Sequence, residues 1–352
     1  MSPLGADNPA LRAARAERLL ELGRAAEARA QITAVLAEVP DDAAAQRLLV
    51  RCLLNLDDPG ALDAALRAVS LAPDHEQGYR LASLACIKAG LDEQAVAHAR
   101  KAAALAPHEW RAHHVLTRAL TRPDPQAAYA AGLVGVELAP LEPAMHLVVG
   151  LAALKSGQTD RAEQAFRTVL RLEPDNATAR NNLAVVDLRS GRFGAAMDGF
   201  SAALSADPRL HLARGNLDAV VLTLLTKLRY IVVVSEFVAF QLIANDPQLD
   251  RVTSAALLAC WAGLIGWGWT RIPPRLRRYS LGVFRRRKRA AVYGAVLLVS
   301  ATGLVLGPLT RVVSTAVGLD LASFAALTIL GDLLWSWQTR RGKNIPGPTT
   351  GR

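Results

Sequence analysis

Two hydrophobic patterns divide this chain of 352 residues. In the first two hundred residues, apolar side chains recur at helical spacing between charged ones, as in MHLVVGLAALKSG followed by QTDRAEQAFRTVLRLEP. That spacing predicts short amphipathic helices. Beyond about residue 217 the apolar residues run together, and whole stretches carry no charge. The pattern therefore predicts an all-α chain made of two different helical parts.

Prolines divide the first part into units of nearly constant length. Their spacing is 33 or 34 residues, and they are Pro40, Pro73, Pro107, Pro140, Pro174 and Pro208. The apolar pattern of a unit breaks once at a glycine: at Gly157 in the unit quoted above, at Gly90 and Gly191 in two others, and at Gly23 in the unit that precedes Pro40. Glycine suits a helix C-terminus, and proline stops the next helix from continuing. Each unit is therefore predicted to be helix, turn, helix.

A two-helix unit of this length resembles the tetratricopeptide repeat (TPR) family. The small residue that the family has early in its second helix matches Ala28, Ala95, Ala162 and Ala196, and its bulky residue four positions later matches Ile32, Phe166 and Phe200, with Ala99 as an exception. The resemblance covers six repeats over residues 8–208, and predicts a TPR-type α-solenoid there. The units after Pro40 and Pro107 depart from the pattern at their inner turns, NLDDPGALD and TRPDPQAAY.

The resemblance implies a concave groove lined by the first helix of each repeat. The positions that would face it carry no acid in the five units after Pro40. We expect an acidic peptide to bind there, with arginine as the carboxylate ligand; the alternative is that these arginines only solvate amphipathic helices. The candidate groove residues are Arg47, Arg51, Arg80, Lys88, Arg111, His114, Arg118, Arg122, Lys155, Asn181 and Arg189.

The second part differs from the first in charge and in hydropathy. The chain has a net charge of +10: the residues after 217 hold 17 Lys/Arg against 6 Asp/Glu, a net of +11, and the residues before them have a net of −1. Apolar stretches of about 18 residues or more are long enough to cross a bilayer. We expect a connecting helix at 209–229 and a membrane domain at 230–340, with spans at about 228–246, 252–270, 290–309 and 315–338.

Basic residues set the expected orientation of the membrane domain. The loop 271–289 holds nine Lys/Arg and no acid, and a second basic cluster, TRRGK, follows the last span. The positive-inside rule places both in the cytoplasm. The first twenty residues lack the apolar core of a signal peptide, so the repeats are also expected to be cytoplasmic. The loop should contact anionic lipid headgroups rather than nucleic acid. The composition, rich in Ala, Arg and Leu and poor in Lys, suggests a GC-rich bacterial genome, so the membrane of these expected spans would be the inner membrane.

The sequence contains no recognisable catalytic or cofactor-binding motif. The seven histidines all precede residue 212, and HEWRAHH at 108–114 has the wrong spacing for a zinc helix. The three cysteines form no CxxC pair. We therefore expect no enzyme, no metal and no cofactor. Glu236 is the deepest acid in the expected spans, and an acid at that depth is a candidate for transport or helix assembly.

Two functions follow from these features. The first is a membrane-anchored TPR adaptor that recruits cytosolic protein partners, with possible homo-oligomerisation through the membrane domain. The alternative is a small transporter, or a transporter subunit, that its TPR domain regulates. Glu236 separates the two, because transport alone would depend on its carboxylate.

Overall fold

The computed structural model describes residues 8–223 and ten isolated positions between 226 and 266. The chain divides into two compact units, Met1–Val186 and Asp187–Arg352. Among the described residues all regular structure is helical, which confirms the predicted all-α class. The helices are α1 (Pro9–Glu21), α2 (Ala25–Glu38), α3 (Ala43–Asn55), α4 (Ala61–Leu71), α5 (Glu76–Ala89), α6 (Asp92–Leu105), α7 (Trp110–Leu120), α8 (Pro125–Leu138), α9 (Pro143–Lys155), α10 (Thr159–Leu172), α11 (Ala177–Arg189) and α12 (Phe193–Ala206), and residues 211–223 are also helical.

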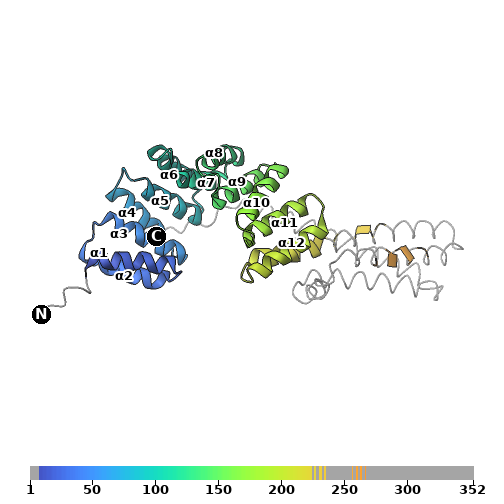
Figure 1. Ribbon diagram of the computed structural model, residues 1–352, viewed down its shortest axis with the longest axis horizontal. Coiled ribbons are helices and arrows are strands. Elements are labelled where there is room, and N and C mark those ends of the chain that lie inside the picture. Colours follow the sequence, from blue (N-terminus) through green and yellow to red (C-terminus); the bar gives the residue numbers. More distant parts are fainter. Residues whose placement is uncertain are drawn as a thin grey trace, which may run out of the picture. The chain divides into compact units, whose positions relative to one another are not determined.

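The first unit is a stack of helix pairs. Helices α1 to α10 follow one another as five pairs, each helix packed against the next along the chain (Figure 1). Pro40, Pro73, Pro107 and Pro140 lie in the connections between pairs, as the sequence predicted. The unit also holds α11 as far as Val186. The second unit contains the end of α11, α12 and the helical residues 211–223, and within it Arg192 Nε donates to Asp187 Oδ1 at 2.8 Å.

The turns inside the pairs confirm the role predicted for glycine. Gly23, Gly90, Gly157 and Gly191 all have φ between 73° and 80°, in the left-handed region. The amide that follows such a glycine reaches back five residues, as from Arg24 N to Leu19 O at 2.8 Å. This is the Schellman closure, which satisfies a carbonyl left free at the end of the first helix.

The turn between α3 and α4 has the same closure without a glycine. Asp57 takes the left-handed conformation with φ 53°, and Asp58 N donates to Leu53 O at 2.9 Å. Aspartate is one of the few non-glycine residues that tolerate this region. The turn between α7 and α8 is different. There Asp124 N reaches back only four residues, to Leu120 O, and the Asp124 carboxylate caps α8 by accepting from Ala127 N.

The left-handed turn at Asp57 gives a small but clean stability test. Asp57→Ala should lower the free energy of unfolding by about 1 kcal/mol, whereas Asp57→Gly should not. Both variants lose the same ion pair with Lys88, so the comparison isolates the backbone cost. Urea unfolding followed by circular dichroism measures the difference. Equal stability of the two variants would contradict a strained backbone at this position.

Small and bulky residues alternate in the core of the stack. Ala28, Ala95 and Ala162, the predicted small positions of the second helices, are fully buried, and so are the bulky Ile32 and Phe166. Ala99, where the sequence departs from the family pattern, is buried as well. A small residue at one position and a large one four residues later lets neighbouring helices approach closely and still fill the interior.

The connections between pairs use a repeated side-chain contact. Six residues after the repeat proline, the side chain donates to that proline's carbonyl: His113 Nε2 to Pro107 O and His146 Nε2 to Pro140 O, both at 2.8 Å. Arg180 makes the equivalent bond to Pro174 O at 2.6 Å. His113 is therefore a structural residue of the connection between two helix pairs.

The predicted membrane domain lies almost entirely outside the described residues. Within the described part, no helix combines the length and the hydropathy that a membrane crossing needs. The spans expected at about 228–246 and 252–270 include only isolated described positions, while 290–309, 315–338 and the loop 271–289 include none. These spans, the connecting helix 209–229 and the domain limits 8–208 and 230–340 therefore stay predictions.

Candidate binding surface

The first helices of the pairs form one continuous surface in the first unit. Helices α1, α3, α5 and α7 each contact the next first helix, so the series of contacts runs from α1 to α9. Equivalent positions recur along it: Arg80, His114 and Leu147 all lie seven residues after a repeat proline. We call this surface, with α11 as far as Val186, the A-helix face. All the candidate groove residues except Arg189 belong to it or border it.

Three of the predicted cations are bound by carboxylates of the preceding pair. Arg51 NH1 on α3 lies 3.1 Å from Glu17 Oε1 on α1. Arg122, just after α7, lies 3.3 Å from Asp92 Oδ2 at the start of α6. Lys88 Nζ on α5 contacts both the Asp57 carboxylate and the carbonyl of Leu54, so it also closes the end of α3. These cations connect neighbouring repeats of the stack.

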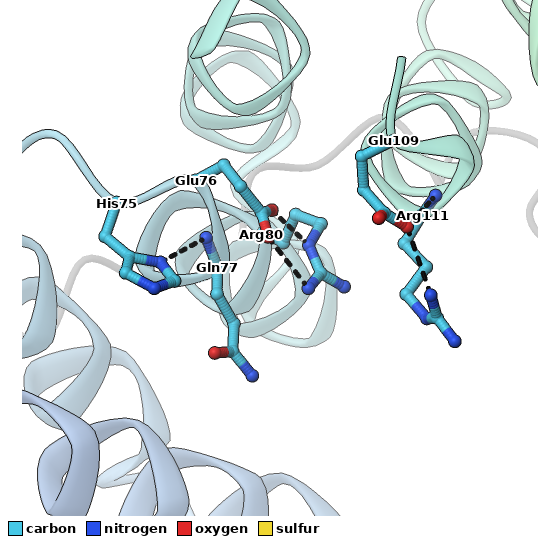
Figure 2. Close-up of polar contacts among 6 residues, drawn as sticks. All are labelled: His75, Glu76, Gln77, Arg80, Glu109 and Arg111. Carbon is cyan, nitrogen blue, oxygen red and sulfur yellow. Dashed lines mark hydrogen bonds and ion pairs between the residues drawn. The ribbon is translucent and has the colours of Figure 1, made fainter. Parts of the chain in front are cut away.

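Two further cations are paired within their own repeat. Arg80 binds Glu76 with both arms of its guanidinium, through Nε at 2.5 Å and NH2 at 3.2 Å. Arg111 NH1 lies 3.2 Å from Glu109 Oε1. Figure 2 shows the two pairs on the neighbouring helices α5 and α7. Burial alone would raise the pKa of Glu109, but hydrogen bonds from the Arg111 backbone and side chain, together with the Arg80 charge, lower it.

Arg118 differs from these cations because it has no carboxylate partner among the described residues. Its side chain is exposed, yet the surrounding protein partly desolvates the guanidinium and lowers its pKa. His114, one turn earlier on α7, is half-buried, and its pKa falls to about 4 because burial, Arg118 and Arg80 all disfavour a second charge. His114 is therefore neutral at pH 7, and Arg118 is the unneutralised charge at this place.

An aromatic side chain, Trp110, contacts both His114 and Arg111. The Trp110 ring meets His114 edge-on, with ring centroids 6.2 Å apart, and the Arg111 guanidinium lies 4.6 Å from the Trp110 ring centroid. Trp110 also packs against the core cluster of Met145 and Val148 on α9. The ring thus helps to fix the positions of His114 and Arg111.

The other candidate residues differ in accessibility. Arg47 and Lys155 are on the A-helix face and have no ion-pair partner among the described residues. Asn181 is only 5% exposed and donates to Asn182 Oδ1, so it offers little to a ligand. Arg189 belongs to the second unit, and Glu236 lies outside the described residues. The structure therefore brings together Arg80, Arg111, His114 and Arg118.

The carboxylates that neutralise this surface lie outside the groove-facing positions that the sequence shows to be free of acids. Glu76 and Glu109 lie three and two residues after a repeat proline, just before the groove-facing positions, and they pair with Arg80 and Arg111 at the start of α5 and α7. Glu17 occupies the equivalent position in the first repeat, which has no preceding proline to mark it. The spacing of Glu76 and Arg80, four residues apart on one helix, is a known pairing signal and could have revealed one of them.

The described residues show no arrangement typical of a metal centre. Among them, no three His, Cys, Asp or Glu side chains are close enough together to hold a metal ion. Cys52 and Cys86 are free and buried, and burial raises the pKa of both thiols. They therefore behave as small core residues rather than as nucleophiles.

Comparison with known proteins agrees with this architecture. The tetratricopeptide repeat family profile matches residues 13–61 and 148–211. A chain of the APC/C hetero-tetramer Cut9-Hcn1 is similar with a TM-score of 0.55 and 18% identity, over 60% of this chain and 43% of that one. The pilus biogenesis factor PilW is similar with a TM-score of 0.52 and 16% identity, over 60% of this chain and 100% of that one.

These likenesses establish the fold and not a shared partner. The chain spans less than half of the Cut9-Hcn1 chain that it matches. A search of curated proteins gave no match. Helices α5 to α8 lie outside the residues that the family profile matches, yet they form the same pairs as their neighbours. The described residues therefore form helix pairs of the solenoid type, and two segments of the chain match the tetratricopeptide repeat profile.

Proposed function

We propose that this protein is a membrane-anchored adaptor whose repeats bind an acidic segment of a protein partner. The observation that carries this proposal is the cationic part of the A-helix face on α5 and α7, where Arg118 has no carboxylate partner within the described residues. A TPR-type solenoid is suited to binding protein or peptide partners through an extended surface. A carboxylate of the partner would pair with Arg118, as the chain's own carboxylates pair with Arg51 and Arg122.

The neutralised cations also have a part in this proposal. Arg80 and Arg111 are held by Glu76 and Glu109, so their guanidinium groups are already oriented when a ligand arrives. Because those pairs neutralise Arg80 and Arg111, the net attraction at α5 and α7 should come from Arg118. Arg47 and Lys155, which also have no ion-pair partner among the described residues, lie on α3 and at the end of α9, so acidic recognition at α5 and α7 is expected to centre on Arg118.

The proposed membrane anchor is inferred from the sequence after residue 217. Two uncharged stretches of 19 and 20 residues and a third with two acids are long enough to cross a bilayer. The basic loop 271–289 would then lie at the cytoplasmic face with the repeats and the C-terminus, against anionic lipid. Extraction of membranes with alkaline carbonate tests the anchor: the full chain should stay in the pellet, and its release would exclude membrane spans.

Substitution of Arg118 tests acidic recognition directly. Arg118→Ala in the full chain should weaken binding of a fluorescent Glu-rich peptide about tenfold, since a hydrogen bond to a charged group contributes about 1.5 kcal/mol or more. Arg122→Ala is the matched control, because Arg122 is also exposed but is already bound by Asp92. Fluorescence anisotropy measures both affinities. Equal loss in the two variants, or none in either, would refute a site centred on Arg118.

A further inference from the structure

The A-helix face changes chemistry between α7 and α9. Arg118 on α7 and Leu151 on α9 occupy equivalent positions, eleven residues after their repeat prolines, and so do His114 and Leu147 at seven residues. Helix α9 carries no Asp, Glu, Arg or Lys before Lys155, its last residue. Helices α7 and α9 contact each other directly. An unpaired cation therefore lies one repeat away from an aliphatic surface on the same face.

The aliphatic surface extends to the next first helix. Leu147 and Leu151 are partly exposed and pack on the core cluster that contains Phe166 and Val186. Leu183 and Val185 of α11 pack on the same cluster and are also partly exposed. Four large aliphatic side chains of two neighbouring helices thus keep part of their surface open. Burial of one leucine side chain is enough to change the affinity of a peptide about tenfold or more.

We infer that the partner segment is bipartite, with an acidic side chain for Arg118 and an aliphatic side chain for the surface formed by Leu147 and Leu151. This inference rests on the proposed function, because it assigns the second half of the same binding surface. Charge complementarity fixes one end of the segment, and the uncharged surface of α9 fixes the other. A purely acidic ligand would leave α9 unused and would desolvate its own charges against leucine.

The helix packing also sets the spacing of the two side chains. Packed helices lie about 8–10 Å apart, and an extended chain advances about 3.3–3.6 Å per residue. The acidic and the aliphatic residue should therefore lie about three positions apart in an extended segment. Either order along the partner is compatible with the surface, and the experiment below distinguishes them.

Four short fluorescent peptides test the inference on the full chain. One has Glu followed three positions later by Leu, the second has the reverse order, the third has Ser in place of Leu, and the fourth has Gln in place of Glu. One of the first two should bind about tenfold more tightly than the third, since burial of one leucine gives at least that factor. The fourth should bind more weakly than that preferred peptide.

The outcomes separate this inference from the proposed function. If the Glu–Ser peptide binds as well as both Glu–Leu orders, acidic recognition stands and the aliphatic half of the site is wrong. If none of the peptides containing Glu binds better than the Gln peptide, the acidic site itself is wrong. Both results are read from the same titrations.

Residue exchanges between the two helices provide the matched variants. Leu151→Arg introduces the residue that this fold already accepts at Arg51 and Arg118, and it should abolish the preference for Leu over Ser. The double exchange of Arg118→Leu with Leu151→Arg keeps the composition and should favour the reverse peptide order. Circular dichroism checks the fold, and Leu147→His, which copies His114, is the second variant if Leu151→Arg unfolds. An unchanged Leu preference in a folded variant would overturn the inference.

Discussion

Phe166→Ala should lower the free energy of unfolding of the repeats by about 3–5 kcal/mol. Phe166 is completely buried, and its ring lies in a cluster with Ala153, Ala162 and Val186, so alanine leaves a cavity that small neighbours cannot fill. The ring also occupies the space over Gly150, where an added Cβ would lie 2.6 Å from Phe166 Cε1. Urea unfolding of the full chain, followed by circular dichroism, measures the loss.

Gly150 provides the control for this prediction. Gly150→Ala alone should destabilise by about 1–3 kcal/mol, because the methyl group meets the ring and the gain in helix propensity of about 1 kcal/mol does not offset the clash. In the Phe166→Ala background the same change should be neutral or stabilising, since the ring is gone. The double mutant should therefore be more stable than the sum of the two single effects predicts, and a double-mutant cycle measures this coupling energy. Additive effects would contradict the close packing of α9 against α10.

The repeat architecture could be predicted because it depends on residues with few alternatives. A left-handed turn nearly always needs glycine. The positions of Gly23, Gly90, Gly157 and Gly191 in the sequence therefore predict four turns, and all four glycines have a positive φ. The turn at Asp57 could not be predicted in the same way. Aspartate occurs in many conformations, and only the surrounding helices impose φ 53° on it.

The candidate site was harder to predict than the fold because charge pairing depends on more than repeat register. Position alone placed Arg51, Arg80 and Arg118 on one surface. It did not show that Glu17 and Glu76 neutralise the first two, since one partner comes from another repeat and the other is the first residue of α5, outside the groove-facing positions. The adjoining aliphatic surface of α9 was visible in the sequence, but its contact with α7 and its partial exposure required the structure.

The pH dependence of stability should report the environment of His114. Its pKa in the folded protein is about 4, below the ordinary value of 6.5, so the unfolded chain takes up the proton first as the pH falls. The stabilising contribution of neutral His114 is therefore complete above pH 6.5 and is lost progressively toward pH 4. At pH 5 the loss should be about 2 kcal/mol, from about 1.4 kcal/mol for each pKa unit.

His114→Gln removes the pH-dependent contribution of His114 to the free energy of unfolding. The variant is therefore compared with the wild type at each pH. At pH 7 the variant differs from the wild type only in packing, and between pH 7 and pH 5 it should lose about 2 kcal/mol less. Urea unfolding at the two pH values measures the difference, and a ring-proton NMR titration gives the pKa of His114 directly. Titration near 6.5, with equal losses in both proteins, would contradict the buried environment.

A third variant separates the causes of the lowered pKa. Burial is the largest cause and the Arg118 charge the next, so Arg118→Ala should raise the pKa of His114 without restoring it to 6.5. A Glu-rich peptide bound at Arg118 should act in the same direction, because a carboxylate near the imidazole favours its protonated form. The NMR titration of His114 with and without peptide therefore tests whether the ligand's acid binds at this surface. A pKa that the bound peptide leaves unchanged would place the acid elsewhere on the protein.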